Sequence, residues 1–115
     1  ITRCGLFDSG RPWSDGNFAL IWIDDPSQVT LSVQRGPRNW SVLVPEQVYS
    51  VGSDANFIVA KQHPQGDRTI VNFWIIDKSK AGKSAISGPL SQSAFIQQAS
   101  SLRLPSFSKT LSSLE

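Results

Sequence analysis

The stretch TIVNFWIID, which runs from Thr69 to Asp77, decides the fold class of this 115-residue chain. Successive side chains of a β-strand point to opposite faces, and both faces are apolar here: Trp74 falls on one, Phe73 and Ile75 on the other. A short apolar run of this kind is typical of a strand covered on both sides. The stretch therefore predicts a central strand, in which Asn72 is half-buried and needs a hydrogen-bond partner.

Other strand-like segments precede this one and are separated by turn signals. Asn17 to Asp24 (NFALIWID) is apolar on both faces, which predicts a second doubly covered strand. The turn residues Asp25-Pro26-Ser27 end it. Further strands are predicted at Gln28 to Gln34, which alternates strictly and has one buried face, at Asn39 to Val44, which places Trp40, Val42 and Val44 on one face, and at Glu46 to Val51 and Asn56 to Gln62.

A single helix is predicted near the C-terminal end. Ser91 is a candidate N-cap, and Phe95, Ala99 and Leu102 follow at the i, i+4, i+7 spacing of one helix face. Pro105 ends the pattern. We expect Phe95 to pack on the sheet, and the Lys-, Ser- and Gly-rich segment 78–89 to be an exposed loop.

These elements predict one mainly β (α+β) domain. We expect a twisted antiparallel sheet, or a partly open barrel, of roughly five or six strands with one C-terminal helix. Residues 1–16 are interpreted as an N-terminal extension, 17–105 as a single β-rich domain whose helix spans about 92–103, and 106–115 as a tail that docks loosely or frays.

The composition argues against several functions. Eleven Lys and Arg against nine Asp and Glu leave a net charge of only +2, so we expect no nucleic-acid partner. One cysteine cannot form an intramolecular disulfide, and one cysteine with one histidine is too few for a transition-metal site, so we expect no cofactor. A nucleophile–base pair would have to join His63 to Cys4 or a distant Ser, and because a plain loop histidine is the simpler interpretation we expect no enzyme. His63 precedes Pro64 and is interpreted as a loop histidine, and the adjacent Asp24 and Asp25 as turn residues.

Exposed loops supply the candidate binding residues. Basic side chains gather in three loops, at Arg35 to Trp40, His63 to Arg68 and Lys78 to Lys83. The candidate partner-binding residues are therefore Arg35, Arg38, Trp40, His63, Arg68, Lys78, Lys80 and Lys83. Because aromatic side chains interleaved with basic ones can stack on bases, a small nucleic-acid-binding β domain stays a lesser alternative.

Several short motifs occur in a fixed order between Trp40 and Pro105. They are VLVPEQV, NFIVAKQHP, NFWIIDK, GPLSQSAF and a closing LRLP. In this order they resemble a family of small, uncharacterised bacterial proteins, many of them predicted lipoproteins. The resemblance implies no catalytic residue.

In that family the pattern tends to follow a lipid-modified cysteine. Here the chain offers Arg3-Cys4-Gly5: the Cys-Gly pair suits a lipoprotein start, whereas Arg3 stands where the signal peptidase needs a small residue. Cys4 is the candidate lipid attachment site, and an unmodified Cys4 is the alternative.

We therefore expect a small non-catalytic binding module of the bacterial envelope, periplasmic or attached to the outer membrane. Its most concrete form is an immunity or inhibitor protein that occludes a partner protein such as a toxin, an effector or a hydrolase. An occluding surface needs shape and charge but no catalytic groups. The main alternative is a structural envelope lipoprotein, and an enzyme would require a pocket in which His63 meets a carboxylate.

Overall fold

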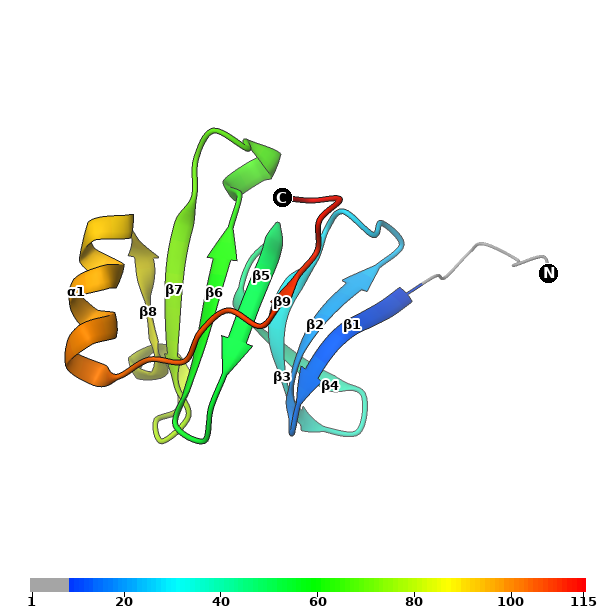
Figure 1. The fold of residues 1–115 in the computed structure, drawn as a ribbon. Helices are drawn as coiled ribbons and strands as arrows, with labels where there is room; N and C mark the ends of the chain where they lie inside the picture. Colours follow the sequence, from blue (N-terminus) through cyan, green and yellow to red (C-terminus); the bar gives the residue numbers. More distant parts are fainter. Residues whose placement is uncertain (1–8) are drawn as a thin grey trace.

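The computed structural model describes residues 9–115, which form two antiparallel sheets and one helix (Figure 1). Sheet A has the strand order β1-β2-β3-β4, and sheet B has the order β8-β7-β6-β5-β9. The strands of sheet A are β1 (Ser9–Asp15), β2 (Phe18–Ile23), β3 (Thr30–Gly36) and β4 (Asn39–Val44). Those of sheet B are β5 (Val48–Ser53), β6 (Phe57–Gln62), β7 (Asn72–Asp77), β8 (Ile86–Leu90) and β9 (Lys109–Thr110). The helix is α1 (Gln92–Leu102), and two 3-10 turns are η1 (Pro64–Gly66) and η2 (Gly82–Ala85).

The main core lies between the two sheets. Leu20 and Leu31 from sheet A pack with Val51, Ile58 and Ile76 from sheet B, and all five are almost fully buried. A second, smaller cluster covers the other face of sheet B and contains Val59, Phe73, Ile75 and Phe95. The order of layers is thus sheet A, sheet B and α1, as Figure 1 shows from right to left. The predicted mainly β class with one C-terminal helix is confirmed.

The strand β7 has the central position that its sequence predicts. It lies between β6 and β8, with Ile76 in the core between the sheets and Phe73 and Ile75 in the cluster under the helix. Asn72 has the expected partner, because its amide Nδ2 donates to Gln62 Oε1 over 3.3 Å. Both faces of β7 are therefore covered.

The helix also matches its prediction. Ser91 Oγ accepts a hydrogen bond from the Ala94 backbone N–H over 3.2 Å, and Arg103 ends the helix in the left-handed conformation. Phe95 is the buried residue of the helix, and its ring lies 4.8 Å from that of Phe73. Among residues 9–115, no helix is long and apolar enough to cross a membrane.

The number of strands differs from the prediction of five or six in one sheet. Strand β1 begins at Ser9, inside the expected N-terminal extension; β8 lies in the expected loop 78–89; and β9 lies in the expected tail, where Leu114 is also buried. These three are edge strands. An edge strand is held by backbone hydrogen bonds to one neighbour, so it can form from polar sequence with no clear alternation.

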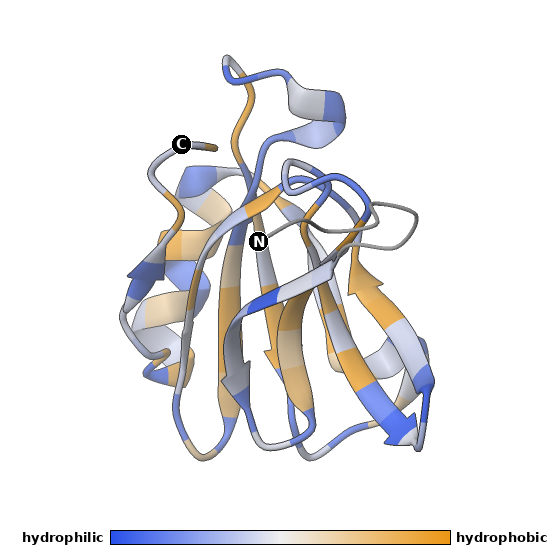
Figure 2. Cartoon of the chain, turned by 90° about the vertical axis from the view of Figure 1, so that its right-hand side faces the viewer, coloured by the Kyte–Doolittle hydropathy of each residue, from blue (hydrophilic) through white to orange (hydrophobic). Residues whose placement is uncertain are grey.

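The prediction that β2 is covered on both faces is wrong. Leu20 points into the core, whereas Ile21 and Ile23 point to the opposite side of sheet A, and Ile23 is 63% exposed. A register shift between β3 and β4 also separates two residues that were expected on one face: Val44 is fully buried and Val42 is 59% exposed. Within residues 9–115, sheet A therefore keeps an uncovered face that carries Ile23 and Val42, on the side of the molecule that Figure 2 turns toward the viewer.

Candidate functional site

The uncovered side of sheet A, which we call the outer face, is defined by its register. Directly paired residues of antiparallel strands share a face, and the pairs Ile21 with Thr30, Ser32 with Val42 and Gln34 with Trp40 place these side chains together. The short turns of a β1-β2-β3-β4 meander produce this arrangement because each strand returns beside the previous one. The face thus combines apolar side chains from β2 and β4 with hydroxyl groups from β3.

The outer face is hollowed along its middle. This outer hollow has a volume of about 450 Å³ and is lined by Ile21, Ile23, Gln28, Thr30, Ser32, Trp40, Val42 and Glu46. Its floor is polar at one point, where the Thr30 and Ser32 hydroxyl oxygens lie 2.9 Å apart and Thr30 Oγ1 also donates to the Ile21 carbonyl at 3.4 Å. The walls are largely apolar, so the hollow suits an apolar side chain better than a charged one.

A cation–π contact lies beside this hollow. The Arg11 guanidinium carbon of β1 is 5.1 Å from the centre of the Trp40 ring of β4, so the two edge strands of sheet A meet through their side chains. A second hollow of about 370 Å³ adjoins the contact and shares Ile21, Ile23 and Trp40 with the first. Ile21, Ile23 and Trp40 therefore separate the two hollows, and the Trp40 ring is the largest of these three side chains.

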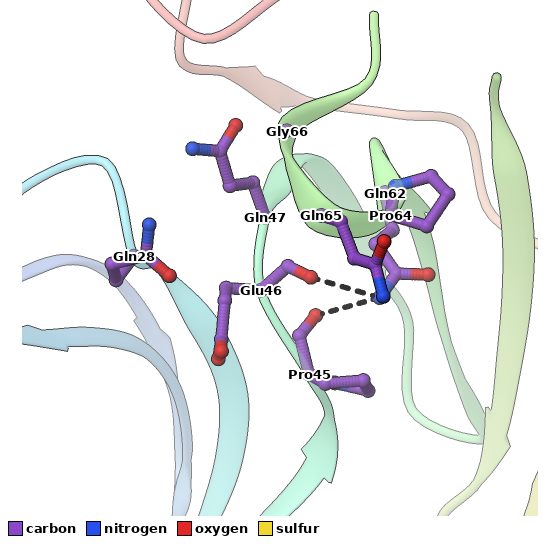
Figure 3. A pocket seen from close by; sticks show the side chains of 8 residues that line it. All are labelled: Gln28, Pro45, Glu46, Gln47, Gln62, Pro64, Gln65 and Gly66. Carbon is purple, nitrogen blue, oxygen red and sulfur yellow. Dashed lines mark hydrogen bonds between the residues drawn. The ribbon is translucent and has the colours of Figure 1, made fainter.

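On the other side of the outer hollow, Glu46 and Gln28 are shared with a polar hollow of about 540 Å³. Figure 3 shows that this polar hollow is bordered by Gln47, Gln62 and Gln65. The Gln62 side chain is 3% exposed and donates through Nε2 to the carbonyls of Pro45 and Glu46, at 2.9 and 3.1 Å. Its Oε1 accepts from Trp74 Nε1 at 2.8 Å. The buried amide thereby fixes the backbone that carries Glu46.

The comparison with known families identifies the group to which the chain is related. A model for proteins of unknown function, DUF3997, matches residues 15–113. The chain belongs to the DUF3997 family. The match spans the strands β2 to β9 and the helix, so it covers nearly all of the fold described above. Searches of curated proteins and of solved structures gave no significant match.

Of the residues predicted to bind a partner, Trp40 is the one that lies on the outer face. Arg35 and Lys80 come together at the far end of the sheets, around a small hollow of about 80 Å³, and Arg35 Nε donates to Ser41 Oγ at 2.9 Å. Arg38 is exposed at the turn between β3 and β4, and Lys83 is exposed in η2. The loop 63–68 lies at the opposite end of the DUF3997 fold (Figure 1). The three loops therefore do not form one surface.

Three of the predicted binding residues make contacts within the fold of this DUF3997 protein. Lys78 Nζ lies 2.8 Å from Asp15 Oδ2, in an ion pair between the sheets. His63 lies in the loop after β6, as interpreted, but its side chain is 2% exposed. Arg68 Nη2 donates to the Ser113 carbonyl at 2.8 Å and so holds the C-terminal segment. The candidate lipid site, Cys4, lies outside the described residues.

The surroundings of His63 explain its burial. Its ring stacks on that of Tyr49 at 4.2 Å, and its two nitrogens lie 2.9 Å from the Ile70 carbonyl and 3.1 Å from the Glu115 carbonyl. Burial, with a smaller effect of the Glu115 charge, raises the pKa of Tyr49. The turn that follows His63 therefore directs the side chain into the protein, which the sequence pattern His-Pro does not reveal.

The carboxyl groups with lowered pKa values in the DUF3997 chain lie in turns and at the junction between the sheets. Side-chain and backbone hydrogen bonds from Thr69 and Ser79 lower the pKa values of Asp67 and Asp77, respectively. Hydrogen bonds from Lys78 and Ser53 lower the pKa of Asp15. Within residues 9–115, no group of three or more His, Cys, Asp or Glu side chains is placed to hold a metal ion.

Sequence reasoning missed most residues of the outer face, namely Arg11, Ile21, Ile23, Val42 and Glu46. A signal was present: Ile21 falls opposite Thr30, so the apolar second face of β2 has a polar neighbour on β3. A buried face would pair apolar residues with apolar residues, as Leu20 and Leu31 do on the inner side. The alternation of β3 was the evidence that one side of sheet A lacks a cover.

Proposed function

We propose that this DUF3997 protein is a small non-catalytic module that binds another protein through the outer face of sheet A. One observation carries the proposal: Ile23 and Val42 are 63% and 59% exposed beside Trp40 in a hollow that no other described element covers. Protein interfaces combine an apolar centre with a polar rim, and Trp and Arg contribute much of their binding energy. The outer face has this composition, with Arg11 and Glu46 at its rim.

The position of the single histidine supports a binding role over a catalytic one. His63 is stacked on Tyr49 and faces two carbonyl oxygens, and it does not line either hollow of the outer face. The titratable side chain in the outer hollow is that of Glu46. A lone exposed carboxylate lacks the partner that general acid–base or nucleophilic chemistry requires.

In its more specific form, the proposal is an immunity or inhibitor protein of the bacterial envelope that covers a partner's active site. The two packed sheets give a rigid support, and a rigid surface loses little conformational entropy when it binds. The resemblance to small bacterial proteins, many of them predicted lipoproteins, is the argument for the envelope. The inhibited partner would be a toxin, an effector or a hydrolase.

The test compares two equally exposed apolar positions on opposite sides of the protein. Val42 on the outer face and Ile96 on α1 are 59% and 56% exposed. The tagged chain carries a photo-crosslinking amino acid at one or the other position in the native cells, and crosslinked proteins are identified by mass spectrometry. We expect one stoichiometric protein crosslinked from position 42 and lost when Ile23→Glu is added on the same face, whereas adding Ile96→Glu keeps it. Equal crosslinking from both positions, or a crosslink from position 42 that Ile23→Glu leaves unchanged, would contradict the proposal.

A structural envelope lipoprotein is the second candidate, and the Cys4-Gly5 pair is the feature that favours it. In that case the protein is held at the membrane by a lipid on Cys4 and needs no protein partner on the outer face. Mass spectrometry of the N-terminal peptide from the native protein distinguishes the two. An acylated Cys4 together with no crosslink from position 42 would favour the structural role.

A further inference from the structure

Glu46 has an unusual position for an exposed carboxylate. It lies at the rim of an apolar hollow, and the other residues of the described chain that line this hollow carry no charge. The ion pairs among the described residues join Lys78 to Asp15 and Lys80 to Asp77, and neither involves Glu46. Its side chain points away from Gln62, toward the side on which Gln28 lies (Figure 3). The carboxylate is therefore available to a cation that approaches the outer hollow.

The backbone at Glu46 is held from inside the protein. Gln62 Nε2 donates to both the Pro45 and the Glu46 carbonyl oxygens, and Gln62 is itself held by Trp74 and Asn72. The adjacent residue is also fixed, since Gln47 exchanges backbone hydrogen bonds with His63 at 3.2 and 2.9 Å. A charge on a fixed backbone costs less conformational entropy to use in binding than a charge on a mobile loop.

Charges are distributed unevenly across the outer face. The strands β2 and β4 run in the same direction within the meander, so Asp24 and Asp25, which follow β2, lie at the same end of sheet A as Glu46, which follows β4. Arg11 lies on the far edge strand, β1, where its guanidinium contacts Trp40. Negative side chains thus gather at the Glu46 end of sheet A, whereas the Arg11 guanidinium lies beside Trp40 in the adjoining hollow.

We infer that the outer hollow recognises a protein segment in which a Lys or Arg lies next to a large apolar residue. The apolar side chain occupies the space between Ile23, Val42 and Trp40, and the cation pairs with Glu46. Charge complementarity fixes the orientation, because the same cation placed at the other end would meet Arg11. This inference rests on the proposed function and adds the chemistry of the partner to it.

The experiment selects binders from a displayed library of random 12-residue peptides on the immobilised full chain, and repeats the selection on Glu46→Lys and on Val42→Glu. The wild-type chain should enrich peptides with Lys or Arg within a few residues of Leu, Ile, Phe or Trp. Selected peptides should bind Glu46→Lys about tenfold more weakly in low salt, with a smaller difference at high salt because the pair is screened. Glu46→Lys should itself enrich Asp and Glu at the same position.

The possible outcomes separate this inference from the proposed function. One outcome would overturn the inference and leave the outer face as the interface. In it, the selected peptides carry no basic residue, do not bind Val42→Glu, and bind Glu46→Lys as tightly as wild type. No wild-type binder, or binders that Val42→Glu retains, would overturn both. Sedimentation of the wild-type chain is the last control: a dimer that Val42→Glu dissociates would show that a second copy occupies the hollow, and it would overturn the inference.

Discussion

Lys78 Nζ lies 2.8 Å from Asp15 Oδ2, and this ion pair joins the end of β7 in sheet B to the end of β1 in sheet A. The same carboxylate oxygen accepts a hydrogen bond from Ser53 Oγ at 2.6 Å, and the ammonium group also donates to the Asp54 carbonyl at 2.6 Å. Two sheets that share a core are thus also connected by polar contacts at one edge. Lys78, which the sequence suggests as a binding residue, has a structural role here.

The first prediction concerns this junction and its pH dependence. Hydrogen bonds from Lys78 and then Ser53 lower the pKa of Asp15 below its ordinary 3.8, so the folded state favours the charged form. Its contribution to the free energy of unfolding is therefore complete above pH 3.8 and is lost as the pH falls through the lowered value.

Asp15→Asn should lower the free energy of unfolding by about 1 kcal/mol at pH 7, a modest figure because the pair is partly exposed and screened. The difference from wild type should vanish toward pH 2. Urea unfolding of both proteins at pH 7 and pH 2 measures this difference. A difference that stays constant with pH would show that the charge of Asp15 does not stabilise the junction.

The second prediction concerns the buried histidine. His63→Ala removes the stacking on Tyr49 and the contacts with the Ile70 and Glu115 carbonyls, which are then left without their partner. We expect a loss of about 2–4 kcal/mol in the free energy of unfolding. Gln65→Ala, at an exposed position of the same loop, is the control and should change it by less than about 0.5 kcal/mol. Equal stabilities of the two variants would show that His63 does not hold this end of the protein.

The third prediction concerns the close contact between β5 and the C-terminal segment. A Cβ at Gly52 would collide with the backbone of Ser106 and Phe107, which passes directly over it. Gly52→Ala should cost about 1–3 kcal/mol because rigid backbone atoms must move. Gly36→Ala is the matched control, since its nearest neighbour would be Asn39 Cβ at 3.9 Å. Thermal unfolding compares them, and an unchanged midpoint for Gly52→Ala would contradict the packing of residues 106 and 107 on β5.

The fourth prediction uses two neighbouring residues of α1. Phe95 is 8% exposed, and its ring centroid lies 4.8 and 5.8 Å from those of Phe73 and Phe107. Ile96, the next residue, is 56% exposed. Phe95→Ala should destabilise the protein by about 3–4 kcal/mol because it leaves a cavity on sheet B. Ile96→Ala should cost less than about 1 kcal/mol. Chemical unfolding of both variants checks the prediction, which fails if the two costs are alike.

The fifth prediction concerns the outer face itself. Val42 and Ile23 are exposed and lie outside the core cluster. Val42→Glu and Ile23→Thr should therefore change the free energy of unfolding by less than about 0.5 kcal/mol. Leu20→Thr, on the inner side of the same strand as Ile23, should cost several times more because Leu20 is fully buried. If Val42→Glu unfolds the protein, the outer face is structural and the binding experiments above lose their basis.

The sequence predicts those parts of the structure in which local pattern and packing agree. The alternation in Thr69 to Asp77, the i, i+4 spacing after Ser91 and the turn residues at Asp25-Pro26-Ser27 each correspond to an observed element. The strands β1, β8 and β9 were not predicted, because each is held by hydrogen bonds to a neighbouring strand and needs no apolar period of its own. The candidate site was predicted only at Trp40, since its other members are adjacent through strand pairing alone.

By itself the sequence determined the β class, the position of the helix, the strand β7 at the centre of a sheet and the need of Asn72 for a partner, because side-chain period and capping act over a few residues. Tertiary structure alone decided that the strands divide into two sheets, that β2 has an uncovered apolar face, and that His63 points inward and Lys78 across to Asp15. Whether an apolar side chain is buried depends on which element covers it, and covering elements come from distant parts of the chain. For that reason the outer face of sheet A includes β2, a strand whose sequence is as apolar as that of a buried strand.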